Sequence, residues 1–161
     1  MNGGSINVRN LSLTWATIAR MPDVPIYRRD FKALADLRAE EARILLAKGK
    51  QQGAYYLAGY AIECALKACI AKKTKKFQFP PKMDYVRELY SHKLKALVSA
   101  SGLDADLTKE IDTNPGFKTN WSTVKDWTEE SRYKASGLNG KDMYNAVTGK
   151  DGVLPCIKQR W

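Results

Sequence analysis

The longest apolar stretch of the chain runs from Gln52 to Ala71, and Glu63 and Lys67 are its only charged residues. It contains no proline, and apolar or small side chains occupy nearly every face of the helix that it predicts. A helix that is apolar on all sides must be surrounded by protein or by lipid. Two central charges cost about 5–7 kcal/mol on the membrane-insertion scale, which exceeds the ~2 kcal/mol returned by the large aliphatic side chains. The pattern therefore predicts the buried central helix of a globular protein, and no membrane partner is expected.

Glu63 and Lys67 are four residues apart, in the order that favours an ion pair along a helix. Two interpretations of this pair stay open at the level of sequence. The pair forms a narrow solvated edge of the central helix, or Glu63 lines a functional groove.

A second long helix is predicted before the central one. Apolar residues recur at helical spacing from Asp30 to Lys48, with Asp30 as the candidate N-cap and Gly49 as the candidate stop. Only residues 49–51 separate this helix from the central one, so the two must pack antiparallel.

The C-terminal half predicts several shorter helices. Ser91 is a candidate cap for a helix that Gly102 ends, and Asn120 is a candidate start for another that includes Trp121 and Trp127. Further helices are expected over 104–112, near 143–147 and after 152. We interpret the tryptophans chiefly as core anchors, with base stacking as the alternative. The expected organisation is a flexible leader, residues 1–25, followed by one all-α domain over residues 26–161.

Charge points to an anionic partner. The chain has 27 Lys and Arg against 17 Asp and Glu, a formal net charge of +10, which favours nucleic acid. Basic residues are dense from 72 to 95, and the proline pair at 80–81 predicts a long basic loop between the second and third helices. The candidate nucleic-acid-binding residues are Lys72, Lys73, Lys75, Lys76 and Lys93. For the run at 72–76, a solvated helix end that complements the helix dipole is an equal alternative.

The residue inventory narrows the chemistry. One histidine and three cysteines fit neither a zinc-site spacing nor a paired disulfide framework, and neither a phosphate-binding glycine loop nor a nucleophile elbow is present. We therefore expect no metal and no other cofactor. Since the cysteines suit a reducing compartment and no secretory signal is visible, the expected location is cytoplasmic.

Arg87 and His92 form an Arg-x4-His pair in the most basic part of the chain. Histidine moves protons near neutral pH, and arginine binds phosphate with a permanent charge. RNA transesterification needs both functions: a base for the 2′-hydroxyl and a cation for the phosphorane. A regular helix would place side chains five residues apart at about 140° from each other. The two converge only if a helix begins between them or a second subunit completes the site.

Four segments resemble the HEPN domain superfamily (higher eukaryotes and prokaryotes nucleotide-binding). They are GAYYLAGYAIECALKACIA, YSHKLKALVSASGL, NWSTVKDWTEESRY and GVLPCIKQRW, and the likeness spans about residues 31–161. Its most specific part is the pattern from Gly53 to Lys67. The resemblance implies a compact bundle of about five helices that forms a homodimer. Many members are metal-independent endoribonucleases with toxin, defence or RNA-processing roles, while others are non-catalytic nucleotide-, RNA- or protein-binding modules.

The resemblance also implies site residues and partners. Arg87 and His92 match the Arg-x4–6-His motif of the family, which is paired with its copy across the dimer, and Glu63 stands where members often carry a polar residue facing the site. RNA and a cognate antitoxin or nucleotidyltransferase are the implied partners. Two positions depart from the pattern: Glu88 follows the motif arginine, and Leu94 stands where silenced toxins carry a modifiable tyrosine.

Overall fold

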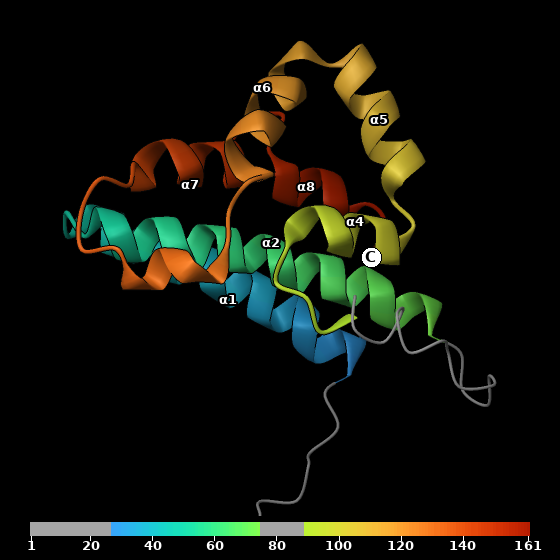
Figure 1. The fold of residues 1–161 in the computed structure, drawn as a ribbon, viewed down its shortest axis with the longest axis horizontal. Helices are drawn as coiled ribbons and strands as arrows, with labels where there is room; N and C mark the ends of the chain where they lie inside the picture. The colour runs from blue at the N-terminus through green and yellow to red at the C-terminus, as the bar shows by residue number, and fades with distance from the viewer. Residues whose placement is uncertain (1–26, 75–88) are drawn as a thin grey trace, which may run out of the picture.

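The computed structural model describes residues 27–74 and 89–161. Its elements are, in chain order, α1 (Arg28–Ala47), α2 (Gln51–Lys73), α4 (Leu94–Ser101), α5 (Asp104–Thr113), α6 (Pro115–Val124), the 3-10 helix η3 (Glu129–Tyr133), α7 (Gly140–Thr148) and α8 (Val153–Lys158). They form a compact all-α bundle, as predicted (Figure 1). The leader predicted at residues 1–25 and the centre of the predicted basic loop lie outside the described residues.

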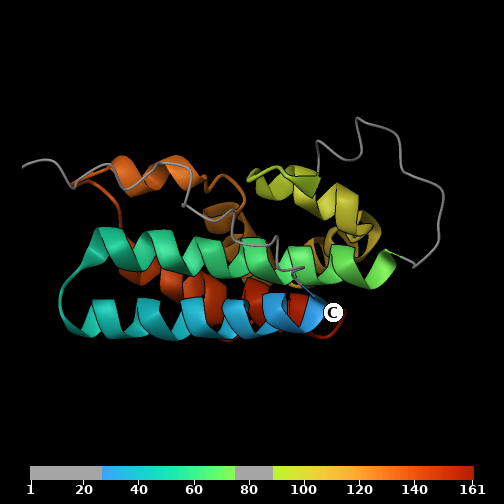
Figure 2. The same ribbon diagram turned by 90° about the horizontal axis from the view of Figure 1, so that it is seen from below.

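The two long helices form the antiparallel hairpin expected from the short turn between them (Figure 2). Gly49 closes this turn with a φ of 70°, a left-handed conformation that glycine adopts without steric cost. The predicted N-cap is wrong, because α1 begins at Arg28 and Asp30 lies in its first turn. There the Asp30 carboxylate accepts a hydrogen bond of 2.8 Å from the backbone N–H of Tyr27.

Helix α2 is the buried centre of the bundle, as its all-round apolar pattern predicted. It packs against α1, α4, α7, α8 and η3. Figure 2 shows α1 and α4 on opposite sides of it. Helices α5 and α6 lie farthest from α1 in Figure 1, and α6 packs on α7 and α8. None of the helices in the described part of the chain is long and apolar enough to cross a lipid bilayer.

The predicted start of the helix at Asn120 is wrong. Helix α6 begins at Pro115, and the Asn114 side chain caps it by accepting a hydrogen bond of 3.0 Å from the backbone N–H of Phe117. Proline is favoured in the first turn of a helix because its missing N–H would have no partner there. Asn120 lies inside the helix, where its side-chain amide donates to the backbone carbonyls of Lys150 and Asp151.

Trp127, between α6 and η3, is a core anchor as predicted, since it is 1% exposed. Its indole lies directly against Gly59 of α2. A Cβ atom at residue 59 would lie 2.2 Å from Cδ1 and 2.3 Å from Nε1 of the indole. Glycine at this position is therefore what lets the ring reach the α2 backbone.

Candidate active site

Glu63 is a buried carboxylate in the middle of α2, with only 1% of its side chain exposed. The interpretation of Glu63 and Lys67 as a solvated helix edge is therefore wrong for Glu63. A buried charge is tolerated only when it is paired and hydrogen-bonded. Glu63 has two such partners, Lys67 on its own helix and His92 on the segment before α4.

The three side chains form a connected network. Lys67 Nζ donates to Glu63 Oε1 over 2.8 Å. His92 Nδ1 lies 2.9 Å from the same oxygen and 3.1 Å from Oε2. An ionised carboxylate only accepts hydrogen bonds, so Nδ1 carries a proton in this contact. In the neutral ring the other nitrogen, Nε2, then holds a lone pair and can accept a proton.

His92 combines this fixed orientation with access to solvent. Its side chain is 45% exposed, against 1% for Glu63. Within residues 27–74 and 89–161, Nε2 makes no hydrogen bond. A buried carboxylate that holds one nitrogen of a solvent-exposed imidazole is the arrangement by which acidic residues orient a catalytic histidine.

The start of α4 fixes the position of His92. Ser91 does not cap this helix as predicted, because α4 begins at Leu94 with Lys93 as its N-cap residue. Instead Ser91 Oγ accepts a hydrogen bond of 3.0 Å from the backbone N–H of Lys93, which spans His92 in a tight local turn. Leu94 is 1% exposed and anchors the following helix in the core. His92 is thus held between a local turn and a buried helix start.

The neighbouring cysteine does not contribute a nucleophile. Burial, and secondarily the negative charge of Glu63, raise the pKa of the Cys64 thiol to about 12. The thiol is protonated at neutral pH, whereas thiolate is the reactive form. All three cysteines are buried and form no disulfide, in agreement with the absence of a disulfide framework from the sequence.

An aromatic groove of about 690 Å³ adjoins this network, because Lys67 lines it. Its walls come from the start of α1, the second half of α2 and residues 89–90. The groove is defined here by Tyr27, Arg28, Phe31, Tyr60, Lys67 and Tyr90. Arg28 Nε is buried and has no acceptor within the described parts of the chain. Tyrosine rings and two cations are suited to an aromatic anion.

The three predicted nucleic-acid-binding lysines that the structure describes line two different hollows. Lys72 and Lys73 line a hollow of about 420 Å³ with Arg160, and Lys72 Nζ donates to the Arg160 carbonyl over 3.0 Å. Lys93 lines a different groove, at the start of α4. Lys75, Lys76 and the predicted catalytic residue Arg87 lie outside the described residues. The structure therefore brings together Glu63 and His92 from the predicted site.

Sequence reasoning missed the neighbours of Lys93. Lys95 and Lys125 each form an ion pair with Asp126, over 2.8 Å and 2.7 Å. Lys95 belongs to the basic stretch and could have been included in the predicted site. The sequence gives no such indication for Lys125 and Asp126, because they are about 30 residues further along the chain.

Comparison of the chain with protein-family models, with curated proteins and with solved structures found no match. The residues and their geometry therefore carry the functional argument.

Proposed function

We propose that this protein is a metal-independent endoribonuclease of HEPN type, with a toxin, defence or RNA-processing role. The observation that carries the proposal is the contact of buried Glu63 with Nδ1 of solvent-exposed His92. His92 would be the catalytic residue, and Glu63 a positioning residue that acts through it. The net charge of +10 supports a polyanionic substrate.

The proposed reaction is an internal transesterification. Nε2 of His92 takes the proton of a ribose 2′-hydroxyl, and the 2′-oxygen forms a bond with the adjacent phosphorus. The bond from phosphorus to the 5′-oxygen breaks, and that oxygen takes a proton from water, while the protonated imidazole returns its proton to the solvent. The products are a 2′,3′-cyclic phosphate and a 5′-hydroxyl. Arg87 is proposed to offset the charge that develops on the phosphorane.

The aromatic groove supports the choice of a nucleotide substrate. Tyr90, at its edge, is 79% exposed, and Tyr27 is 53% exposed. Exposed aromatic rings stack on nucleobases without sequence preference. Because Lys67 both lines the groove and binds Glu63, a base held there would lie beside the His92 network.

The finer partners belong to the same proposal. A homodimer would bring Arg87 and His92 next to their copies, and a cognate antitoxin or nucleotidyltransferase would control the activity. A cytoplasmic location would give the enzyme access to RNA. An alternative is a non-catalytic module that binds nucleotide, RNA or a protein. The pairing of buried Glu63 with both Lys67 and His92 favours it, because a buried charge needs such partners whether or not the site is catalytic.

Purified protein is expected to cleave single-stranded RNA in the presence of EDTA and to leave 2′,3′-cyclic phosphate ends. The 2′-hydroxyl is the nucleophile, so a single 2′-deoxy residue at the mapped site should block cleavage there. Product ends can be identified by their sensitivity to phosphatase after acid opening of the cyclic ester. Intact RNA across diverse sequences would contradict the proposed activity and favour the binding module. Cleavage at the 2′-deoxy position would instead contradict the transesterification mechanism.

Glu63→Gln is expected to lower kcat for RNA cleavage at least about tenfold while KM stays unchanged. The glutamine keeps the size of the side chain but loses the charge that holds Nδ1–H. Loss of such an orienting partner costs about 10–100-fold at metal-bound histidines and about 10⁴-fold in the Ser-His-Asp triad. Steady-state kinetics and a thermal unfolding curve measure the two effects. The curve identifies a variant that is unfolded at the assay temperature, and such a variant is excluded. An unchanged kcat in a folded variant would remove the positioning role.

A further inference from the structure

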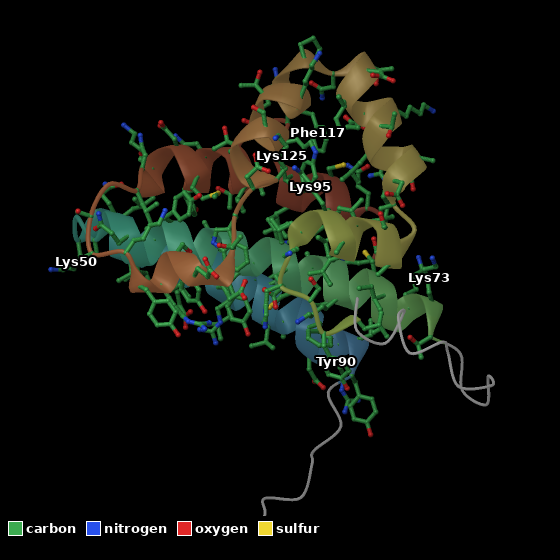
Figure 3. All side chains as sticks on the ribbon, in the orientation of Figure 1. Lys50, Lys73, Tyr90, Lys95, Phe117 and Lys125 are labelled. Atoms are coloured by element: carbon green, nitrogen blue, oxygen red, sulfur yellow. The ribbon has the colours of Figure 1, made fainter. Side chains whose placement is uncertain are left out.

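A second groove begins at the residue after His92. It has a volume of about 430 Å³ and is lined by the first turn of α4 and by the chain that follows α6. We call it the lysine groove and define it by Lys93, Lys95, Lys125, Asp126, Trp127 and Thr128. Lys95 and Lys125 lie close to each other near the centre of Figure 3, and Tyr90 lies below them, near the start of α1.

The charges in the lysine groove are not balanced. Lys95 Nζ contacts Oδ1 of Asp126 and Lys125 Nζ contacts Oδ2. The groove is thus lined by three lysines and one carboxylate, and two of the three ammonium groups contact that carboxylate. The hydrogen bond from Lys125 has the largest effect on the pKa of Asp126, followed by that from Lys95. Together they lower this pKa to about 2, so the carboxylate is ionised at neutral pH. The remaining positive charge lies where a second anion can share the lysines.

Stability alone does not explain this arrangement. Surface ion pairs contribute little to folding, about 0–1 kcal/mol, and both lysines are solvent-accessible. The wall of the groove is rigid instead, because Trp127 is 1% exposed and packed on α2. Lysines on a rigid wall are suited to position a phosphate backbone rather than to read bases.

The position of the groove relative to His92 indicates which phosphates it would hold. Leu89 and Tyr90 line the aromatic groove, and Lys93 and Leu94 line the lysine groove. His92 is between them in the chain. A strand that crosses His92 would therefore pass from one groove to the other.

We propose that the lysine groove is a backbone subsite for single-stranded RNA next to His92, and that Asp126 competes with the RNA phosphates for Lys95 and Lys125. This inference rests on the proposed function for the identity of the ligand. It adds two contact residues and one inhibitory residue that the proposed reaction does not use.

The test measures binding rather than cleavage, so the two proposals can fail separately. The probe is a fluorescent single-stranded 2′-O-methyl RNA, which cannot be cleaved because its 2′-oxygen is blocked, and the readout is fluorescence anisotropy at several salt concentrations. Lys95→Ala/Lys125→Ala is expected to weaken binding about tenfold and to reduce the salt slope by roughly 1.4, since each phosphate contact to a single strand contributes about 0.7.

The matched control is Lys50→Ala/Lys141→Ala, which removes the same charge from exposed positions. Lys50 is at the left end of the bundle in Figure 3, away from Lys95 and Lys125, and Lys141 lies in the first turn of α7, where its backbone N–H donates to the side chain of Gln51. This control should keep the salt slope of the wild type. If the two double variants lose the same RNA affinity, the subsite proposal is wrong, and the RNA is attracted only by the overall positive charge of the protein.

Asp126→Asn is the sharper variant, because it breaks two ion pairs and is nevertheless expected to strengthen binding. Removal of a unit charge about 4 Å from a phosphate in water corresponds to roughly a fivefold gain. Asp112→Asn, at an exposed position of α5, makes the same change in net charge and should have a much smaller effect. Unchanged or weaker binding by Asp126→Asn would contradict the proposal that Asp126 competes with RNA phosphates. If all the binding effects are as predicted but the protein cleaves no RNA, the subsite proposal stands and the proposed ribonuclease activity is wrong.

Discussion

His92→Ala is expected to lower the rate of RNA cleavage by about 10²–10⁴-fold, the usual contribution of a general acid–base group. The imidazole is the proton acceptor in the proposed reaction, and Glu63 orients it through Nδ1. Single-turnover cleavage of a labelled RNA, with enzyme in excess, measures this step without a contribution from product release. Binding of the 2′-O-methyl RNA should change little, because the variant keeps both grooves.

His92→Gln is the matched variant for this prediction. A glutamine amide can still donate a hydrogen bond to the Glu63 carboxylate, but it cannot exchange a proton at neutral pH. It should therefore restore the thermal stability of the site without restoring activity. Because the His92 side chain is 45% exposed, added imidazole should reach the space left by alanine and recover part of the rate. Cleavage by both variants at the wild-type rate would remove His92 from the mechanism.

Gly59→Ala is expected to destabilise the fold by about 2–3 kcal/mol, at the upper end of the range for overpacked cores. The new methyl group would lie 2.2 Å from the indole of Trp127, which is packed on α2 and cannot move without opening the core. This penalty exceeds the gain of about 1 kcal/mol that alanine normally brings to a helix interior. For a chain of this size the melting temperature should fall by roughly 4–12 °C.

Gly53→Ala is the control on the same helix. The methyl group at residue 53 would approach only the Cδ1 atom of Leu45, at 2.9 Å, and that atom is the end of a flexible side chain. The helix-propensity gain should then balance or exceed the cost. Differential scanning calorimetry of the two variants separates the contributions. A Gly59→Ala protein as stable as Gly53→Ala would show that Trp127 is not held firmly against α2.

The fold could be predicted from local patterns where those patterns are long. The apolar run of α2 and the short turn at Gly49 were sufficient for the central hairpin. The start of α6 was missed because the helix predicted over 104–112 ends just before Asn114 and Pro115, and these two residues were not recognised as the start of a new helix. In the structure Asn114 ends one helix and caps the next, so the same two residues carry both signals.

The candidate site could be predicted only in part, because its contacts join distant positions. Glu63 and His92 were each identified, but their contact spans 29 residues of sequence and depends on how α4 docks on α2. The same docking makes Glu63 buried rather than solvated. The cluster of Lys95, Lys125 and Asp126 has no local sequence signature, since the end of α6 supplies two of its members.

Trp127 lies against Gly59 and also lines the lysine groove, and Gly59 is one helical turn before Glu63. A repacking of this indole would therefore displace the wall of the groove and the helix that carries the carboxylate together. Substitutions at positions 59 and 127 should therefore be coupled. Homologues that replace Gly59 are expected to replace Trp127 with a smaller residue as well. Directed evolution of RNA affinity should therefore accept substitutions of the surface residues Lys95 and Lys125 more readily than substitutions of Gly59 and Trp127 in the core beneath them.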